Sequence, residues 1–102
     1  MKADPIMDER HVFDDRSFAE IIIWRLPRAL PGSSHAFKYR LAFVVDGVCT
    51  LRYDNEAGKG DHRHVPPGQR EEPYSFTTVA ALLDDFAADI EAWRRNHENG
   101  DV

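Results

Sequence analysis

Two histidines separated by one residue, His62 and His64, are the side chains in this sequence best suited to acid–base chemistry. Imidazoles can supply both a general base and a general acid. Metal-independent cleavage of RNA needs those two roles, together with cations that stabilise the charge developing at phosphorus. His62 and His64 are therefore candidate catalytic residues for that reaction.

Basic, aromatic and glycine residues near this pair complete the candidate site. Lys38 and Arg40 join the histidines as candidate catalytic residues, as does Tyr53, for which a place at the edge of the core is the competing interpretation. Arginine makes bidentate contacts with phosphate, and glycines let backbone amides approach a phosphate closely. The candidate substrate-binding residues are Arg52, Arg63, Lys59, Asn55, Gly58 and Gly60.

Three other interpretations of these residues stay open. A metal-dependent hydrolase would use the His-X-His pair, whose spacing occurs in zinc sites. A non-catalytic protein would bind an anionic or protein partner through its basic end. In the third interpretation the residues are only solvated and paired with local acids. With no cysteine nearby, we predict no metal and no cofactor; further ligands would have to come from Asp54, Glu56, Asp61 or His35.

A predicted β-hairpin must position these residues. Residues 37–45 and 48–53 are rich in β-branched and aromatic side chains, which favours strands. Asp46 and Gly47 between them indicate a two-residue type I′ turn, because both of its positions need positive φ. Counting back from this turn puts Arg40 opposite Tyr53 and Lys38 opposite Asn55 on one face of the hairpin.

Shorter strands are predicted on both sides of the hairpin. After a loop over residues 54–60, residues 61–65 form a strand that puts His62 and His64 on one face and Arg63 on the other. The other predicted strands, one preceding the hairpin and one at an edge of the sheet, are residues 18–26 and 73–76.

The last predicted element is a helix that starts after Thr77 or Thr78, either of which can cap it, and ends at about Asn96. Its apolar residues form one stripe and are Val79, Leu82, Leu83, Phe86, Ile90 and Trp93. Trp24 and Trp93 are both expected in the core. The element order predicts an α+β fold, an antiparallel sheet of about four strands with the C-terminal helix packed on one face.

The expected organisation is one α+β domain over residues 18–96, preceded by an irregular N-terminal arm at 1–17 and followed by a polar tail at 97–102. The net charge of −5 argues against broad nonspecific binding to nucleic acids. The charge is uneven, since residues 34–70 carry six Lys/Arg against four Asp/Glu, whereas residues 71–102 carry two against eight. An anionic ligand is therefore expected at the middle of the chain.

The expected location is the cytoplasm, with no membrane partner. No apolar run approaches the roughly 20 residues of a membrane span, and the charged N-terminus is unlike a signal peptide. The single cysteine, Cys49, excludes an intramolecular disulfide and fits a reducing compartment.

The sequence resembles the TumE-like family of bacterial toxin–antitoxin toxins at residues 38–40, 52–64 and 72–77. The similarity covers roughly residues 18 to 95 and is most specific where Asp54-Asn55 is followed by glycines and the His-X-His pair. It implies the toxin of a two-gene system, neutralised by a cognate antitoxin with a helix-turn-helix domain. Together with the residues above, it leads us to expect a toxin that acts on RNA as a metal-independent endoribonuclease.

Overall fold

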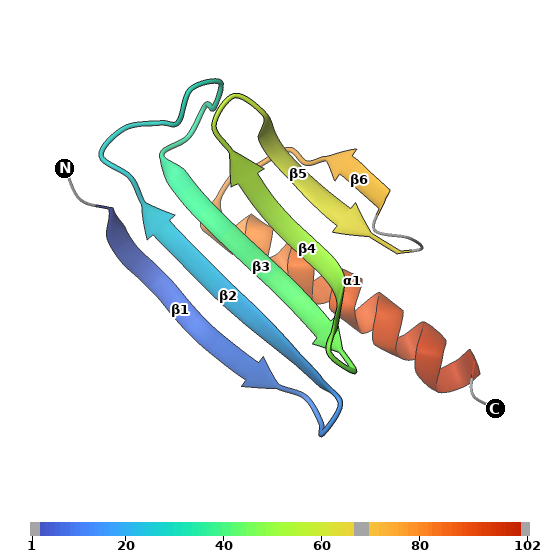
Figure 1. The fold of residues 1–102 in the computed structure, drawn as a ribbon. Helices are drawn as coiled ribbons and strands as arrows, with labels where there is room; N and C mark the ends of the chain where they lie inside the picture. The colour runs from blue at the N-terminus through green and yellow to red at the C-terminus, as the bar shows by residue number, and fades with distance from the viewer. Residues whose placement is uncertain (1–2, 67–69, 101–102) are drawn as a thin grey trace.

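In the part of the chain that the structure describes, six antiparallel strands form one sheet in chain order, and one helix lies against a face of it (Figure 1). The computed structural model describes residues 3–66 and 70–100, with side chains described as far as residue 97. The elements are β1 (Asp4–Val12), β2 (Ser17–Arg25), β3 (Phe37–Val45), β4 (Val48–Glu56), β5 (Gly60–Val65), β6 (Arg70–Pro73) and α1 (Val79–Gly100). The predicted α+β class is confirmed, with six strands in place of about four.

The β3–β4 hairpin has the predicted turn. Asp46 and Gly47 have φ values of 51° and 78°, and Val45 pairs with Val48 across the turn. Strand β3 has the predicted bounds, whereas β4 continues past the predicted end at Tyr53 as far as Glu56. Most of the loop expected at residues 54–60 is therefore strand.

A β-bulge in β4 makes the predicted register wrong by one residue. Val44 pairs with Cys49 but Phe43 pairs with Leu51, so Thr50 is an extra residue on the β4 side. A bulge of this kind moves every later residue of its strand to the opposite face. Thr50 gives no clear sign of it in the sequence.

Beyond the bulge, Arg40 pairs with Asp54 and not with Tyr53, and Leu41 pairs with Tyr53. The β3–β4 ladder ends with Arg40 and Asp54, so the predicted Lys38–Asn55 pair is not part of it. Arg52 and Asp54 consequently share the face of Arg40, whereas Tyr53 lies on the face of Leu41, opposite to the expectation.

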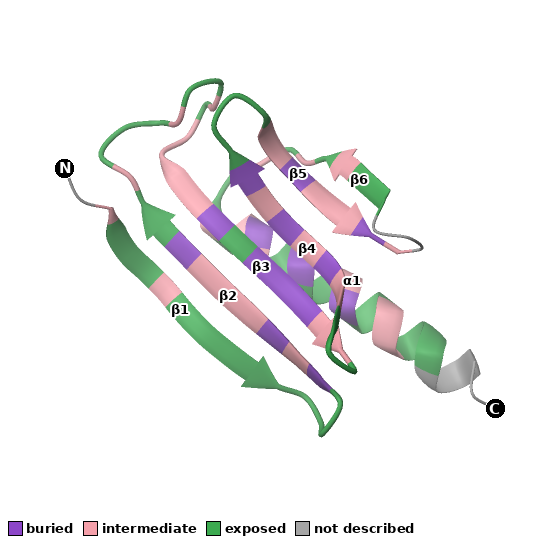
Figure 2. Cartoon of the chain, in the orientation of Figure 1, coloured by how far each residue is buried: buried purple, intermediate pink, exposed green. Residues whose placement is uncertain are grey.

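The first strand, β1, occupies residues that were expected to form an irregular arm. It has nine residues and pairs with β2 along the edge of the sheet, from Asp4 with Arg25 to Val12 with Phe18, with a register shift between Pro5 and Met7. Almost all of β1 is exposed, as Figure 2 shows in green. An edge strand of this kind tolerates charged side chains and a proline, so it lacks the apolar alternation by which strands are recognised.

The last strand lies earlier in the chain than the predicted residues 73–76. β6 comprises Arg70–Pro73, and the ladder to β5 ends with the Tyr74 N–H donating to Asp61 O at 3.1 Å. Tyr74 and Phe76 then leave the sheet so that their rings can pack on the core, with Phe76 stacked on His35 at 4.0 Å between centroids.

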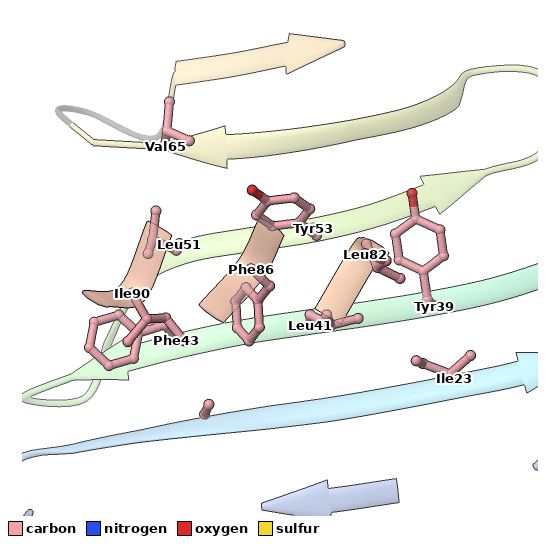
Figure 3. Packing of buried hydrophobic residues seen from close by; sticks show 11 residues of the cluster. Ile23, Tyr39, Leu41, Phe43, Leu51, Tyr53, Val65, Leu82, Phe86 and Ile90 are labelled. Atoms are coloured by element: carbon pink, nitrogen blue, oxygen red, sulfur yellow. The ribbon is translucent and has the colours of Figure 1, made fainter. Parts of the chain in front are cut away.

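The core lies between α1 and the central strands (Figure 3). Thr78 caps the helix, its Oγ1 accepting the Ala81 N–H at 3.0 Å, as predicted. The predicted stripe is confirmed; Leu82, Phe86 and Ile90 are buried and its other members pack around them. The helix continues to Gly100, past the expected end near Asn96, so the expected tail at 97–102 begins as helix and its last two residues lie outside the described range.

The face of the sheet opposite α1, here called the open face, is not covered by any other described segment (Figure 1). Trp24 lies on it beside Lys38, its partner in the β2–β3 ladder, and is 37% exposed. The expectation that Trp24 belongs to the core is therefore wrong, whereas Trp93 packs on the core with its ring against Phe43. No described helix is long and apolar enough to cross a membrane.

Candidate active site

Strands β3, β4 and β5 bring the chemically active side chains of the open face into two neighbouring rows. In one row Arg40 pairs with Asp54 and Asp54 with His62; in the next, Arg52 pairs with His64. The predicted placement of both histidines on one face is confirmed, and their ring centroids are 5.2 Å apart. The β4–β5 register puts Asp54 and Arg52 beside them, and the bulge at Thr50 puts this face of β4 on the side of Arg40.

The four side chains from β4 and β5 are in direct contact. His62 Nε2 lies 2.7 Å from Asp54 Oδ1, and Arg52 Nε lies 3.2 Å from Asp54 Oδ2. Arg52 Nη2 donates to His64 Nε2 at 3.0 Å. Because a guanidinium N–H can only donate, His64 Nε2 is the acceptor in this contact.

A second carboxylate reaches this cluster from the edge of the sheet. Glu71 on β6 has its Oε1 3.5 Å from His62 Nε2 and 4.0 Å from His64 Nε2. Lys59 Nζ contacts the same oxygen at 2.7 Å, and this hydrogen bond lowers the pKa of the Glu71 carboxyl below its ordinary value. Glu71 therefore stays ionised beside both imidazoles.

Among the described residues, three buried polar atoms of the cluster have no hydrogen-bond partner: Arg52 Nε, Asp54 Oδ1 and His62 Nδ1. The short contacts at Asp54 have ion-pair distances but lack hydrogen-bond geometry. His62 is only 4% exposed, so water does not readily satisfy its ring. A buried polar atom without a partner costs about 1 to 3 kcal/mol, and native proteins hold few of them. The cluster therefore lacks a partner for these buried polar atoms.

The cations at the border of the cluster differ in availability. Arg40 is exposed and lies directly beside Asp54 in the ladder. Lys38 is half-buried, and its Nζ donates to Asn55 O. Arg40 and Arg52 are thus the open-face cations best placed to meet an anion.

Tyr53 and Arg63, two other sequence-predicted site residues, lie on the helix-covered face. The Tyr53 hydroxyl donates to Asp89 on α1, and Figure 3 shows its ring among the core side chains. Burial, reinforced by this hydrogen bond, raises the pKa of Tyr53. Arg63 forms ion pairs with Glu72 at 3.0 Å and Asp89 at 3.1 Å. Neither residue is brought to the histidine pair.

The polar groups of the β4–β5 turn are largely engaged within the fold. Asn55 is buried; its amide donates to Phe37 O at 2.7 Å, and its Oδ1 accepts the Tyr39 N–H at 3.1 Å. The Gly58 N–H donates to Pro31 O at 2.8 Å. Gly58 and Gly60 both have positive φ, at 78° and 82°, which glycine adopts at low cost. These residues shape the turn rather than reaching the histidines.

A second histidine–carboxylate cluster lies on the helix-covered face, and all its interacting atoms have partners. His35 Nε2 donates to Asp61 Oδ2 at 2.7 Å, and its Nδ1 accepts the Phe37 N–H at 3.1 Å. The Tyr39 hydroxyl donates to the same Asp61 oxygen at 2.6 Å. Burial and this hydrogen bond raise the pKa of Tyr39. His35 and Asp61, considered above as metal ligands, are separated from His62 by the sheet.

A groove of about 790 Å³ runs between α1 and the helix-facing side of β1 and β2. Apolar side chains such as Ile21, Leu83 and Phe86 form most of its wall, with charged residues such as Glu9 and Arg94 among them. It lies on the other side of the sheet from the histidine pair. The open-face cluster is therefore a surface site and not the floor of this groove.

Sequence reasoning missed two members of the cluster. Asp54 was considered as a possible metal ligand or a local ion-pair partner, in a segment expected to be a loop, and no contact with the histidines was predicted. Glu71 was not considered, because the strand that carries it was expected later in the chain. The signal that could have found it is the position of Glu71 and Glu72, which pair with His64 and Arg63 in the β5–β6 ladder.

The family model described as Toxin TumE matches residues 2–94. The chain belongs to the TumE toxin family. The match includes β1 and begins at residue 2, so it covers residues 2–17, which the sequence resemblance left out. No curated protein and no solved structure matches this chain. As a toxin of a toxin–antitoxin family, it has an antitoxin as its partner.

Proposed function

We propose that this TumE family toxin cleaves RNA at the open face of β3, β4 and β5. The observation that carries the proposal is the contact between two imidazoles, a carboxylate and an arginine on an uncovered sheet face. These are the groups that phosphodiester cleavage requires, namely proton-transfer groups together with a cation for phosphate. An open face also admits a long polymer, which an enclosed pocket would not.

In the proposed reaction, the RNA 2′-oxygen attacks the adjacent phosphorus and the bond to the 5′-oxygen breaks. The 2′-hydroxyl proton goes to a base in the cluster, and the leaving 5′-oxygen receives a proton, which yields a cyclic phosphate and a 5′-hydroxyl end. Arg40 and Arg52 bind the phosphate oxygens and stabilise their charge in the transition state.

Trp24 supports RNA as the polymer. It lies on the same face, with its ring 37% exposed and Lys38 as its cross-strand neighbour. Exposed aromatic rings beside cations stack unpaired bases of single-stranded nucleic acids. We therefore place a base on Trp24 and the scissile phosphate toward Arg40.

The cluster can transfer protons in two ways. Free imidazoles would act directly, as the metal-independent interpretation of the sequence expects. Alternatively, Asp54 and the histidines would hold a divalent ion whose bound water is the base. The burial of His62, which is 4% exposed, favours the second way, because a buried ring presents little surface to a 2′-hydroxyl.

The proposal extends to the partner and the location. The antitoxin is expected to carry a helix-turn-helix domain, in line with the family resemblance, and to block the open face or the groove. The toxin is expected to act in the cytoplasm, where bacterial RNA is accessible.

The test compares induction of the wild type with that of a His62→Ala/His64→Ala double variant in a host without the antitoxin. A His11→Ala/His97→Ala double variant is the matched control, because both of these histidines are exposed and distant from the cluster. We expect growth arrest and new 5′-hydroxyl RNA ends with the wild type and the control, and neither with the cluster variant.

A folded cluster variant that still arrests growth would overturn the site. Growth arrest without any new RNA ends would overturn cleavage and favour a binding protein, for which Arg40→Lys should be tolerated and activity should fall steeply with salt.

A further inference from the structure

The open-face cluster has a donor set typical of transition-metal sites. One ligand atom each from Asp54, His62 and His64 lies within 4.8 Å of the other two. Ligands bound to one zinc-like ion at about 2.1 Å lie at most roughly 4.2 Å apart. Small side-chain rotations therefore suffice to bring the three atoms onto one ion.

The unsatisfied atoms of the cluster point independently to a ligand. Asp54 Oδ1 is buried and has no hydrogen-bond partner, and His62 Nδ1 on the nearly inaccessible ring has none either. In the His35–Asp61 cluster, made of the same residue types, each interacting atom has a partner. An ion bonded to Asp54 Oδ1 and to His62 Nε2 would give that oxygen the partner it lacks, whereas His62 Nδ1 lies on the other side of the ring.

We propose that Asp54, His62 and His64 bind one divalent transition-metal ion, with Glu71 as a fourth ligand. Glu71 Oε1 is already 3.5 Å from His62 Nε2 and 4.0 Å from His64 Nε2. Two imidazoles with carboxylates suit Zn²⁺ or Mn²⁺, whereas Mg²⁺ and Ca²⁺ prefer oxygen ligands alone.

Arg52 and Lys59 compete with the ion for two of its ligand atoms. Arg52 occupies the lone pair of His64 Nε2 at 3.0 Å, and Lys59 holds Glu71 at 2.7 Å. Ion binding displaces both cations from these atoms. Arg52 is then free to turn to a substrate phosphate, which links occupation of the ion site with substrate binding.

The proposed metal site depends on the proposed function only for the role of the ion in cleavage. In that role the ion would activate a water as the base. Metal binding itself is measured without RNA, so the two proposals can fail separately.

The first experiment titrates the untagged, chelator-treated, full-length toxin with Zn²⁺, Mn²⁺ and Mg²⁺ by calorimetry. We expect one equivalent of Zn²⁺ or Mn²⁺ and no comparable binding of Mg²⁺. Saturation should raise Tm by about 10 °C or more at an ion concentration a hundredfold above Kd.

Two ligand variants and one control locate the site. Asp54→Asn and His64→Ala should each weaken Zn²⁺ binding by more than about 100-fold, since loss of even an outer-shell partner costs 10- to 100-fold. His11→Ala, which removes an exposed histidine paired with Glu9, should leave the affinity unchanged. Equal affinity in the wild type and both ligand variants would overturn the proposal, as would the absence of Zn²⁺ and Mn²⁺ binding.

The Arg52→Ala variant distinguishes ion binding from the action on the RNA substrate. It removes the cation that competes for His64, so Zn²⁺ should bind at least as tightly as to the wild type while RNA cleavage falls. Ion binding without RNA cleavage by the wild type would leave the metal site standing and overturn the proposed function. RNA cleavage that survives chelation, with no ion bound, would overturn the metal site and leave the proposed function standing.

Discussion

Asp61 and His62 are neighbours in β5, yet they belong to two histidine–carboxylate clusters on opposite faces of the sheet. On the covered face, His35, Asp61 and Tyr39 form a closed hydrogen-bond network under the helix. On the open face, Asp54 and His62 are just as close but leave buried atoms without partners. The same residue types thus form a finished structural network in one place and an incomplete site in the other.

The largest expected effect comes from exchanging the two carboxylates for alanine. Asp61→Ala leaves the His35 ring and the Tyr39 hydroxyl without their shared partner, which should lower the free energy of unfolding by about 3 kcal/mol. Asp54→Ala should lower it by only about 1 kcal/mol, since the contacts of Asp54 with His62 and Arg52 lack hydrogen-bond geometry, and should abolish growth arrest. Urea unfolding and growth curves measure the two quantities.

The reverse result would break the comparison. If Asp54→Ala unfolds the protein and Asp61→Ala leaves it stable but non-toxic, then the covered cluster is the active one.

A smaller effect is expected when the aromatic ring of the open face is removed. Trp24→Ala should weaken binding of single-stranded RNA about 5- to 150-fold, the range of one lost base stack, with little change in stability. Fluorescence anisotropy with a labelled oligonucleotide gives the affinity. Val48→Ala, which removes an exposed apolar residue at the hairpin turn, is the control and should bind RNA normally. Equal losses in both variants would remove Trp24 from the site.

Alkaline pH should lower the stability of the protein mainly through the helix-covered face. Burial and the hydrogen bond to Asp61 raise the pKa of Tyr39, so the folded protein keeps this phenol protonated where the unfolded chain ionises it. The stabilisation is complete below about pH 10 and is lost as the pH rises above it, by up to about 1.4 kcal/mol per pH unit. Tyr39→Phe should make this slope shallower in urea unfolding, although Tyr53 and Tyr74 also have raised pKa values. His64→Ala should leave the slope as it is.

The smallest effect concerns the turn that was expected to bind phosphate. Gly58→Ala should cost about 1 kcal/mol because of its positive φ, since an added Cβ meets no atom within 4 Å. Gly47→Ala at the far hairpin turn has the same geometry and should cost the same. Neither should change RNA cleavage by the folded protein. Loss of RNA cleavage in the Gly58 variant alone would show that the backbone amides of this turn belong to the active site.

Local patterns in the sequence predicted much of the fold. The β3–β4 turn follows from Asp46-Gly47, and the helix follows from its apolar stripe and the capping Thr78. The charged edge strand β1 was missed because an edge needs no alternation of apolar residues. The bulge at Thr50 was missed because a bulge depends on the pairing of two strands and leaves no local mark.

The site could be predicted only in part for the same reason. His62 and His64 were placed on one face, because residues two apart in a strand always are. Their contacts with Asp54 and Glu71 depend on the register of β4 and on the position of β6, which are set by long-range pairing. Trp24 was assigned to the core because large aromatic residues are mostly buried, and only the position of the helix shows that its face is uncovered.

The extra residue at Thr50 also makes the toxin respond differently to a substitution and to a deletion at this position. A change of that codon alters one half-buried side chain, whereas loss of the codon reverses the facing of β4 as far as its turn with β5. Tyr53 would then face solvent, and Asp54 would face the helix. A three-nucleotide deletion there is thus expected to disarm the toxin through the architecture of its sheet, without altering any residue of the histidine cluster.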